Sequence, residues 1–588
     1  MHVSTSNRRD FLRTLAAGTV AAGSAGLMVG CEAGAFDFLH GVASGDPQND
    51  RVMLWTRVTP DAAMLELIAT LERAAHNGGD EPGELLKQTR RVPVQWEVAR
   101  DEDFRHIVAR GVARALAERD YTVKVDATGL RAATPYWYRF RCLGALSGAG
   151  RTRTLPRGHV EQVRLAVFSC SNYPAGYFNV YRAAAQLEDV DAALHLGDYI
   201  YEYDKDGYAS AQAAALDRVV DPQGELITLA DYRRRYAQYR TDADLQAVHA
   251  ALPFIAVWDD HEVANDAWRN GAENHQSATE GDWAARRAAA IQAYHEWMPT
   301  RLPDPKRPER IYRSFDFGNL VSLHMLDTRV IGRDQQMDLT SYVGATGFDG
   351  ARFAADLANP TRQLLGLEQS SWLNTQLTRS NAQWQLLGQQ VLMGRMNVPA
   401  PLLLGQISVS GNVALVAKAQ SNPAALTPAE LAILGAPAIP YNLDAWDGYA
   451  VARETLLGTV RSLDKNLVVL AGDTHNAWAS DLADFQGNAV GVEFATPSVS
   501  SPGFESIFPA EDPRVFAGAL QQLIGPLVYT DTSRRGFMVI TATPLDVQAQ
   551  WTFVDTVSSH TYQTVSGPTL RTLPGAAGRK VEALAAAA

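Results

Sequence analysis

Cysteine is scarce in this chain, with only Cys31, Cys142 and Cys170 among 588 residues. A small scaffold held together by disulfides is therefore excluded. Positive charge is also in deficit, because 53 Lys and Arg face 65 Asp and Glu and leave a net charge of −12. This balance argues against binding through a general positive field, so we expect no stable complex with nucleic acid. An anionic substrate stays open, since a local cation would reverse the sign at one site.

Long apolar runs are missing as well, and no segment after residue 35 predicts a transmembrane helix. The stretch 15–30 is mildly apolar and rich in Gly, Ala, Ser and Thr, whereas spanning a bilayer takes about 20 strongly apolar residues. Arg8 and Arg9 precede this stretch, a pattern typical of a twin-arginine export signal. We therefore predict that residues 1–35 are a signal peptide read by the twin-arginine export machinery. The mature protein is then periplasmic or extracellular.

Two endings of this signal compete. Ala33-Gly34-Ala35 fits a small-residue cleavage site, whereas Cys31 would be the lipidated residue of a poor lipoprotein box. We favour cleavage after Ala35, which also removes Cys31. Export after folding suits a protein that takes up a metal ion inside the cell, so this signal already indicates a cofactor.

Residues 36–155 have the composition of β structure. Four β-rich runs have the length of strands: 52–58, 92–98, 121–125 and 136–142. Short strands at this spacing predict a small immunoglobulin-like β-sandwich domain. Alternation along the last run places Cys142 on its apolar face, which favours a buried thiol over the alternative of a disulfide to Cys170.

The sequence changes character near residue 156. Five apolar runs of strand length each end at residues able to bind metal or phosphate: 165–170, 192–198, 254–261, 321–327 and 467–475. Near-continuous apolar strands predict a sheet covered on both faces, and therefore an α/β fold. Three helical stretches would supply the cover: 181–187, 284–297 and 367–378. Ligands of such sheets bind at the carboxyl ends of the strands, so the five clusters predict one site.

The remaining segments carry less information. We assign residues 156–574 to one catalytic domain. Within it, residues 400–445 are rich in Pro, Ala and Leu and predict an insertion of unknown role. Residues 575–588 are Ala-rich with few anchoring groups, so we expect a disordered tail.

Acidic residues dominate the five clusters. Asp198, Asp260 and Asp473, with Asp259 and Asp327 nearby, would bring several negative charges into one pocket. Carboxylates that share a low-dielectric site cannot all ionise cheaply, so one of them takes a proton or a cation neutralises them. The clusters therefore predict a metal site.

Other donors widen the choice of metal. Cys170, Tyr201 and His475 would add sulfur, oxygen and nitrogen ligands to the carboxylates. Carboxylates suit hard cations such as Ca²⁺, Mg²⁺ or Mn²⁺, whereas thiolate and imidazole suit iron or zinc. A bridging carboxylate that holds one metal of each kind satisfies both sets, and two metals about 3.5–4 Å apart can clamp a phosphoryl transfer.

Five motifs occur in a fixed order: FSCSN at 168–172, GDYIYE at 197–202, WDDHEVAND at 258–266, LDTR at 326–329 and GDTH at 472–475. Together they resemble the PhoD-like alkaline phosphatases of the metallophosphoesterase superfamily. FLHGVASGDP at 38–47 and WTR at 55–57 resemble the small β domain of that family. The resemblance implies a metallophosphoesterase-like layered sandwich with helices flanking mixed sheets, export by the twin-arginine route, and hydrolysis of phosphate esters with iron and calcium.

The resemblance also implies ligands. Those of Fe³⁺ would be Cys170, Asp198, Tyr201 and His475. Those of Ca²⁺, with the first residue bridging to iron, would be Asp198, Asp260 and Asp473. The wider superfamily often has a second histidine where Asp473 stands, and the resulting oxygen-only shell favours calcium over zinc. The number of calcium ions stays open.

Further roles follow from the same resemblance. His261 takes the position that contacts the phosphate or protonates the leaving oxygen. The candidates for phosphate contacts or further ligands are Asn172, Asn265 and Arg329. We expect a secreted monomer that hydrolyses phosphate monoesters and diesters with a metal-bound hydroxide or oxo group as nucleophile. The sequence contains neither a Walker phosphate-binding loop nor a Gly-x-Ser-x-Gly nucleophile elbow. We therefore expect direct attack on phosphorus without a covalent serine intermediate.

Two alternatives remain at this point. The same site would also serve a phospholipase D-like phosphodiesterase that acts on lipid or nucleic-acid diesters. From another class, the chain would be a non-catalytic exported protein that binds metal or phosphate. That reading requires lost ligands, and the expected aspartates and final histidine are present.

Overall fold

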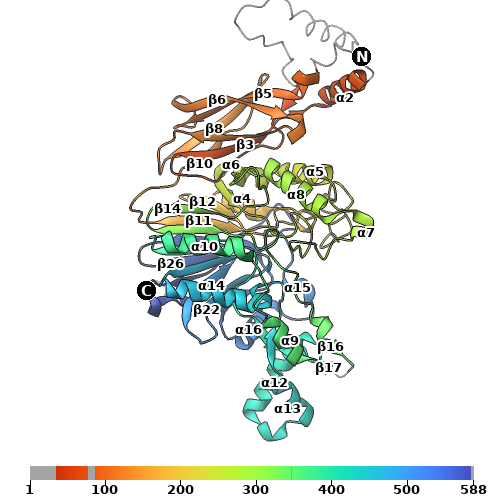
Figure 1. The fold of residues 1–588 in the computed structure, drawn as a ribbon, viewed down its shortest axis with the longest axis vertical. Helices are drawn as coiled ribbons and strands as arrows, with labels where there is room; N and C mark the ends of the chain where they lie inside the picture. Colours follow the sequence, from red (N-terminus) through yellow and green to blue (C-terminus); the bar gives the residue numbers. More distant parts are fainter. Residues whose placement is uncertain (1–34, 77–85, 346, 585–588) are drawn as a thin grey trace, which may run out of the picture.

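The computed structural model describes residues 35–76, 86–345 and 347–584. Two mixed sheets lie face to face, and helices cover their outer faces (Figure 1). The predicted signal peptide, Cys31 included, lies outside the described residues except for its last position. Among the described residues, no helix is both long enough and apolar enough to cross a membrane.

The first sheet has ten strands, of which the central four run parallel. From edge to edge they are β28 (Glu582–Ala583), β27 (Thr564–Thr572), β26 (Val547–Val554), β25 (Arg535–Ala542), β11 (Val163–Phe168), β12 (Ala192–His195), β13 (Pro253–Ala256), β2 (Val42–Gly45), β3 (Arg51–Arg57) and β7 (Thr122–Thr128).

The second sheet has seven strands, and its parallel core is β15, β18, β21 and β23. In order they are β14 (Arg313–Phe317), β15 (Val321–Met325), β18 (Trp384–Gly388), β21 (Asn466–Ala471), β23 (Ala489–Ala495), β22 (Ala477–Ala483) and β24 (Leu527–Asp531). The five apolar runs are strands as expected, but they divide between two sheets.

Both faces of the second sheet are buried, which explains its unbroken apolar strands. Val468 packs into the core between the two sheets, and its neighbour Val469 packs into the core under the outer helices. Leu386 and Leu387 divide in the same way. Because successive side chains of a strand point to opposite faces, such a strand needs apolar residues at every position.

Helices cover the outer faces. On the side of the ten-stranded sheet lie α4 (Asn179–Ala185), α5 (Leu229–Arg240), α6 (Ala243–Ala251) and α8 (Trp283–Trp297). On the side of the seven-stranded sheet lie α10 (Gly366–Arg379), α14 (Ala450–Ser462) and α16 (Pro513–Leu523). Helix α5 begins with a capping box of Thr228 and Asp231, and the Asp242 carboxylate caps α6. The three predicted helices are present as α4, α8 and α10.

The N-terminal part shares one layer with the rest of the molecule. Its own sheet consists of β10 (Gly150–Arg153), β8 (Pro135–Cys142), β5 (Arg91–Ala99) and β6 (Ile107–Leu116), with β9 (Ala145–Leu146) beside β8. The facing layer is β2, β3 and β7, and β2 pairs with β13 of the central sheet. The four predicted strands are present, whereas the immunoglobulin-like character of this part and the boundary at 155 stay predictions. Cys142 and Cys170 are buried and do not form a disulfide with each other.

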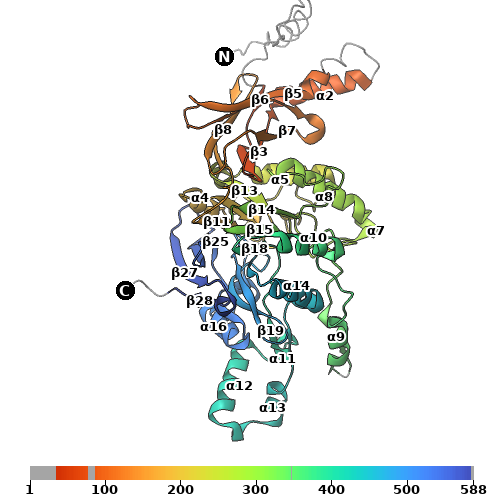
Figure 2. The ribbon, with the colours of Figure 1, turned by 60° about the vertical axis from the view of Figure 1, so that its left-hand side comes forward.

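The middle of residues 400–445, with the helices α12 and α13, projects from the molecule (Figures 1 and 2). The two short strands β19 (Asn397–Pro399) and β20 (Ala438–Pro440) pair at its base. Between them lie α11 (Ala400–Leu403), α12 (Val409–Ser421) and α13 (Pro428–Leu434). Other elements are β1 (Phe36–Asp37), β4 (Thr59–Pro60), α2 (Ala62–His76), α7 (Ser277–Glu280), β16 (Val343–Gly344), β17 (Gly347–Phe348), α9 (Gly350–Leu357) and α15 (Phe504–Ile507).

The C-terminal segment differs from the expected disordered tail. Residues 575–584 contain a 3₁₀ turn and strand β28, which pairs with β27. Arg579 forms an ion pair with Asp464, and the Val581 amide donates to the Asp481 carboxylate at 2.7 Å. These anchors were not visible in an Ala-rich sequence, because their partners lie about a hundred positions earlier.

Candidate functional site

The polar clusters lie in loops that follow the carboxyl ends of β11, β12, β13, β15 and β21. Three of these strands belong to the ten-stranded sheet and two to the seven-stranded sheet. The loops meet at one end of the sandwich, and their side chains contact one another across the two sheets. The general rule that ligands gather at the ends of parallel strands therefore applies to both sheets at once.

Two glycines allow the loops to approach closely. A Cβ atom on Gly197, whose φ is +107°, would lie 2.3 Å from the Cβ of Asp259. A Cβ atom on Gly472 would lie 2.7 Å from the Cβ of Ser169. The residue after each glycine, Asp198 or Asp473, has a left-handed backbone with φ near +60°. Such strained conformations in adjacent loops are common at functional sites.

One group of possible metal ligands combines three elements of the sequence. Ligand atoms of Cys170, Asp198 and His475 all lie within 4.8 Å of one another. The Tyr201 hydroxyl joins them, 3.1 Å from Asp198 Oδ2 and 3.2 Å from His475 Nε2. The His475 Nδ1–H donates to the Pro502 carbonyl at 2.9 Å, which leaves Nε2 to face the group. The four residues expected around iron thus lie together.

A second and a third group extend the acidic region. Asp198, Asp260 and His261 form one, and Asp259, Asp260 and Asp473 form the other, again with ligand atoms within 4.8 Å. Asp198 belongs to two groups and Asp260 to two. This sharing gives a chain of carboxylates that could bridge neighbouring cations.

His261 is held by a carboxylate that we did not single out from the sequence. Its Nδ1 lies 2.7 Å from Oε2 of Glu202, which is fully buried. The other Glu202 oxygen accepts the Asn265 amide at 2.7 Å and the Asn274 side chain at 2.8 Å. The ring of His261 stacks on Tyr201 with centroids 4.2 Å apart. The imidazole is therefore fixed in orientation, with Nε2 as the nitrogen available for proton transfer.

Glu262 joins two of the loops through their backbones. Its buried carboxylate accepts the amides of Asp198 at 3.1 Å, Tyr199 at 2.6 Å and Asp259 at 2.8 Å. These hydrogen bonds fix the loop after β12 against the loop after β13. Glu262 therefore determines where the carboxylates of Asp198 and Asp259 lie.

Arg329 is a buried centre of ion pairs. Its guanidinium donates to Asp259 at 2.5 Å, Asp473 at 3.0 Å and Asp444 at 2.8 Å. Asp260 lies 3.8 Å away. The carboxylates surround this cation, so its part in binding phosphate stays a prediction.

The two predicted asparagines lie at the edge of the site. Asn172 donates to the Tyr208 carbonyl at 3.2 Å, and its buried Oδ1 has no protein partner within the described ranges. Asn265 donates from its side chain to Glu273 at 3.1 Å, away from the ligand groups. Among the described contacts, neither asparagine forms a hydrogen bond to a member of the three groups of possible metal ligands. The roles of both residues stay predictions.

Burial and crowding shift the pKa values of these groups. Burial raises the pKa of Asp198 well above its ordinary value, with Asp259 and Asp260 adding to the effect. Burial, followed by the charges of Asp444 and Asp260, raises the pKa of Asp473 to about 7 against the opposing effect of Arg329. Burial also raises the pKa of the Cys170 thiol. Anionic ligands are therefore costly here unless a cation stabilises them.

The donor atoms fit such cations. Asp198 Oδ1 and Asp259 Oδ2 are buried and have no hydrogen-bond partner among the atoms described. Burial lowers the pKa of His475 to about 3, so its imidazole is neutral and able to coordinate. Sulfur, imidazole and phenol on one side suit a transition metal, and the all-carboxylate group on the other suits a hard cation.

Comparisons with known proteins agree with this geometry. The model of the PhoD-like phosphatase family matches residues 165–551, and that of the PhoD-like phosphatase N-terminal domain matches residues 22–156. The chain belongs to the PhoD-like phosphatase family. It is 38% identical over 522 residues to alkaline phosphatase D of Bacillus subtilis (strain 168), covering 85% of this chain and 77% of that protein.

A solved structure described as the structure of PhoD matches with a TM-score of 0.74 and 33% identity. The match covers 95% of this chain and 94% of that one. The family and the enzyme class expected from the motifs are thus confirmed: this PhoD-like chain is a hydrolase of phosphoric esters. Its layered fold of helices and mixed sheets is confirmed. Phosphatases of this family are metal-dependent, and the described residues of this chain include candidate metal-binding groups.

Proposed function

We propose that the chain is an exported phosphatase that hydrolyses phosphate monoesters and diesters at the ends of the two sheets. The observation that carries this proposal is the convergence of Cys170, Asp198 and His475 with the carboxylates of Asp260 and Asp473. Export through the twin-arginine pathway rests on the Arg8-Arg9 signal.

In this proposal two kinds of metal ion share the site. The ligands of Fe³⁺ are Cys170, Asp198, Tyr201 and His475. The ligands of Ca²⁺ are Asp198, Asp260 and Asp473. Bound metal ions supply Lewis acidity, which activates water and neutralises charge on the phosphate. The donors of Cys170, Tyr201 and His475 would suit iron, and the carboxylates of Asp260 and Asp473 would suit calcium.

His261 supplies the proton. Burial opposes its charge, but Glu202, Asp260 and Asp198 raise its pKa well above the ordinary value. The protonated ring donates Nδ1–H to Glu202, so Nε2–H is the proton that passes to the ester oxygen. A water oxygen bonds to phosphorus and releases one of its protons to solvent, while the bond from phosphorus to the ester oxygen breaks and the alcohol leaves with the proton of His261.

The test uses the purified full chain with elemental analysis and a panel of monoesters and diesters. Asp198→Asn removes a charge shared by two ligand groups, so we expect at least about 100-fold lower kcat/KM and a loss of bound metal. Asp103→Asn, at an exposed carboxylate of the N-terminal part, is the matched control and should change neither quantity. Normal turnover and metal content in Asp198→Asn would refute the shared ligand. An iron-free, fully active preparation would remove iron from the proposal.

A further inference from the structure

The outer face of the N-terminal sheet carries a concentration of arginine. Side chains alternate along β5, β6, β8 and β10, and one set packs into the core against β2, β3 and β7. The other set points away from this core, and six of its members are basic: Arg91, Arg110, Arg114, Arg139, Arg141 and Arg151. We call this surface the arginine face.

The strand register shows that these arginines share one side of the sheet. Arg110 of β6 lies opposite Glu97 of β5, and Glu97 lies opposite Arg139 of β8. Arg151 of β10 lies opposite Trp137, two positions before Arg139 on β8. Directly opposite residues of antiparallel strands point to the same side, so the arginine face extends across all four strands.

Carboxylates neutralise only part of this charge. Glu97 is the only acidic residue of the four strands, and it pairs with Arg139 at 2.8 Å and lies 4.0 Å from Arg141. The other four arginines form no ion pair with any residue that the structure describes: Arg91, Arg110, Arg114 and Arg151. Since the chain as a whole has a net charge of −12, this face has the opposite sign to the rest of the protein.

Acidic residues limit the arginine face at one end. The turn from β5 to β6 contains Asp101, Glu102 and Asp103. Asp103 pairs with Arg105 at 2.9 Å, and Asp101 accepts the amides of Arg105 and His106, each at 2.8 Å. Two of the three acids are therefore engaged within their own turn, and the strands keep their excess of positive charge.

Apolar side chains are exposed among the arginines. Val112 is 65% exposed and lies between Arg110 and Arg114 on the outward side of β6. Leu146 of β9 is 48% exposed and lies opposite Arg141. Basic and apolar groups on one surface suit a membrane interface, where guanidinium groups meet lipid phosphates and apolar groups reach the acyl boundary. A soluble polyanion offers no contact to Val112 or Leu146.

The chain enters this sheet directly after the predicted signal peptide. Strand β1 begins at Phe36, which packs into the core beneath the sheet, and β1 contacts β9. Figure 1 shows β5, β6 and β8 at one end of the molecule and α12 and α13 at the other. A signal peptide that engages a membrane during export would therefore bring the end with the arginine face to the bilayer.

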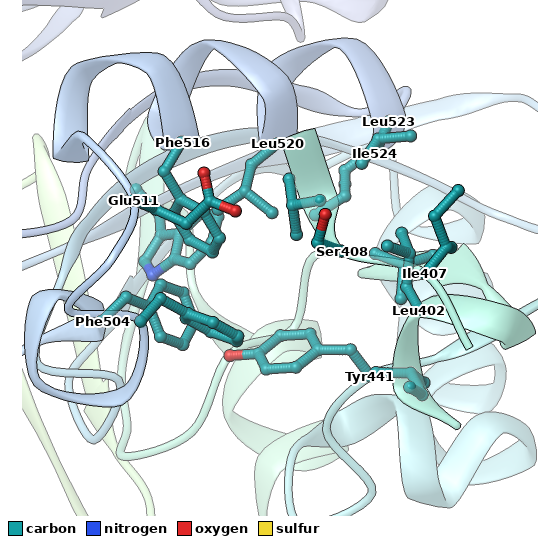
Figure 3. Close-up of a pocket in the computed structure, with 15 residues that line it drawn as sticks. Leu402, Ile407, Ser408, Tyr441, Phe504, Glu511, Phe516, Leu520, Leu523 and Ile524 are labelled. Atoms are coloured by element: carbon teal, nitrogen blue, oxygen red, sulfur yellow. The ribbon is translucent and has the colours of Figure 1, made fainter. Parts of the chain in front are cut away.

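The apolar pocket between the insertion and α16 lacks such charge. Leu402 and Phe516 lie on facing walls of this pocket (Figure 3). No basic residue lines it, and its one charged lining residue is Glu511. An anionic surface is therefore attracted to the arginine face rather than to this end of the molecule.

We propose that the arginine face binds the surface of a membrane that contains anionic phospholipids. The guanidinium groups donate hydrogen bonds to lipid phosphate oxygens, and Val112 and Leu146 contact the apolar boundary below the headgroups. The contact is peripheral and holds the protein at the membrane. It goes beyond the hydrolysis of phosphate esters and does not depend on it.

The test measures sedimentation of the full chain with vesicles of phosphatidylcholine alone and with equimolar vesicles of phosphatidylcholine and phosphatidylglycerol. We expect stronger binding to the mixed vesicles. Raising the salt from 0.1 M to 1 M should remove this difference, because the Debye length falls from about 10 Å to about 3 Å.

Charge reversal should locate the contact. Arg114→Glu combined with Arg151→Glu should weaken binding to the mixed vesicles at least about 25-fold, because each basic residue near an anionic surface contributes about a fivefold factor. Arg352→Glu combined with Arg514→Glu changes the net charge equally at two exposed arginines outside the arginine face, and should bind as the unaltered protein does. Equal thermal unfolding curves will show that both double variants are folded.

Each other outcome overturns the inference in a distinct way. Equal binding to both kinds of vesicle would show attachment without recognition of negative charge. Unchanged binding by Arg114→Glu with Arg151→Glu would place the contact on another surface. Binding of inorganic polyphosphate but not of vesicles, lost in the same double variant, would assign the arginine face to a soluble polyanion.

Discussion

Glu202 and Glu262 are two fully buried carboxylates with different tasks. Glu202 faces the ring of His261, whereas Glu262 faces backbone amides of the ligand loops. Both follow residues that bind metal in our proposal, Glu202 four positions after Asp198 and Glu262 two positions after Asp260. At the residue scale the site therefore depends on an inner layer of acids and on an outer layer that orients them.

Glu202→Gln should separate proton donation from metal binding. Glu202 is the largest favourable contribution to the raised pKa of His261, so its loss lowers that pKa. A lower pKa leaves less of the protonated ring at alkaline pH, and the falling alkaline limb of the kcat profile should move to lower pH. We expect kcat to fall about 10²- to 10⁴-fold while metal content stays constant.

Glu273→Gln is the control for this change, because Glu273 is an exposed carboxylate that contacts Asn265 near the same loop. It should leave the profile unmoved. An unchanged alkaline limb in Glu202→Gln would show that His261 is not the proton donor.

Glu262→Ala should act on metal retention. The change removes the acceptor of three amides, which frees the loops that carry Asp198 and Asp259. We expect metal affinity to fall about 10- to 100-fold. If Tyr201 binds Fe³⁺ as proposed, the charge-transfer colour that this ligand would give should be lost as well. Dialysis against a chelator, followed by elemental analysis and a visible spectrum, measures both. Glu161→Gln, at an exposed carboxylate, should retain metal as the unaltered protein does. Equal retention of metal in Glu262→Ala would show that the hydrogen bonds of Glu262 do not hold the ligand loops in place.

The sequence could reveal some of these residues and not others. Asp198, Asp260 and Asp473 end apolar runs, so the position of each at a strand end was predictable. Glu202 is the last residue of the GDYIYE motif, but the sequence does not reveal its hydrogen-bond partner, because His261 is 59 positions away. The contact of Arg329 with Asp444 joins residues 115 positions apart, and no local pattern encodes it.

At the scale of elements, β23 places a buried acid beside the loop that follows β18. The Glu493 carboxylate accepts the amides of Met393 at 2.6 Å and Gly394 at 2.8 Å. Burial raises its pKa from 4.5 to about 7. The folded protein then holds this proton up to pH 7, whereas the unfolded chain releases it near pH 4.5.

This difference predicts a fall in stability with rising pH. Between pH 4.5 and pH 7 the folded state binds more protons, so the free energy of unfolding should decrease by about 3 kcal/mol and then level off. Glu493→Gln has no proton to lose and should abolish this part of the decrease. Urea unfolding at several pH values measures it, with Glu188→Gln as an exposed control. A decrease that persists in Glu493→Gln would assign it to another group.

The prediction of strands and helices from the sequence succeeded where the pattern of apolar residues is clear. The apolar runs of β12 and β21 identify buried strands, but each has the same character on both faces, so the sequence does not say which sheet each joins. The attachment of β2 to β13 was also unreadable, since parallel pairing depends on contacts some 200 positions apart.

At the scale of the whole molecule, the N-terminal part is joined to the rest by backbone and by charge. Asp46, just after β2, accepts two hydrogen bonds from Arg313 of β14, at 2.6 and 2.9 Å. Its amide donates to the Phe254 carbonyl of β13 at 2.9 Å. Trp55 Nε1 donates to the Glu296 carbonyl at 2.8 Å. These links cross the boundary near residue 155 that the composition predicts, so we expect one cooperative unfolding transition.

Asp46→Ala tests that expectation. The change leaves the guanidinium of Arg313, whose side chain is only 10% exposed, without its carboxylate, which should cost about 3–5 kcal/mol of the free energy of unfolding. If the parts unfold together, calorimetry will show a single transition that moves as a whole to lower temperature. Asp103→Ala breaks an exposed pair with Arg105 and should cost less than about 1 kcal/mol. Two separated transitions, of which only one moves, would instead show that residues 36–155 fold independently and that the shared sheet adds little to their stability.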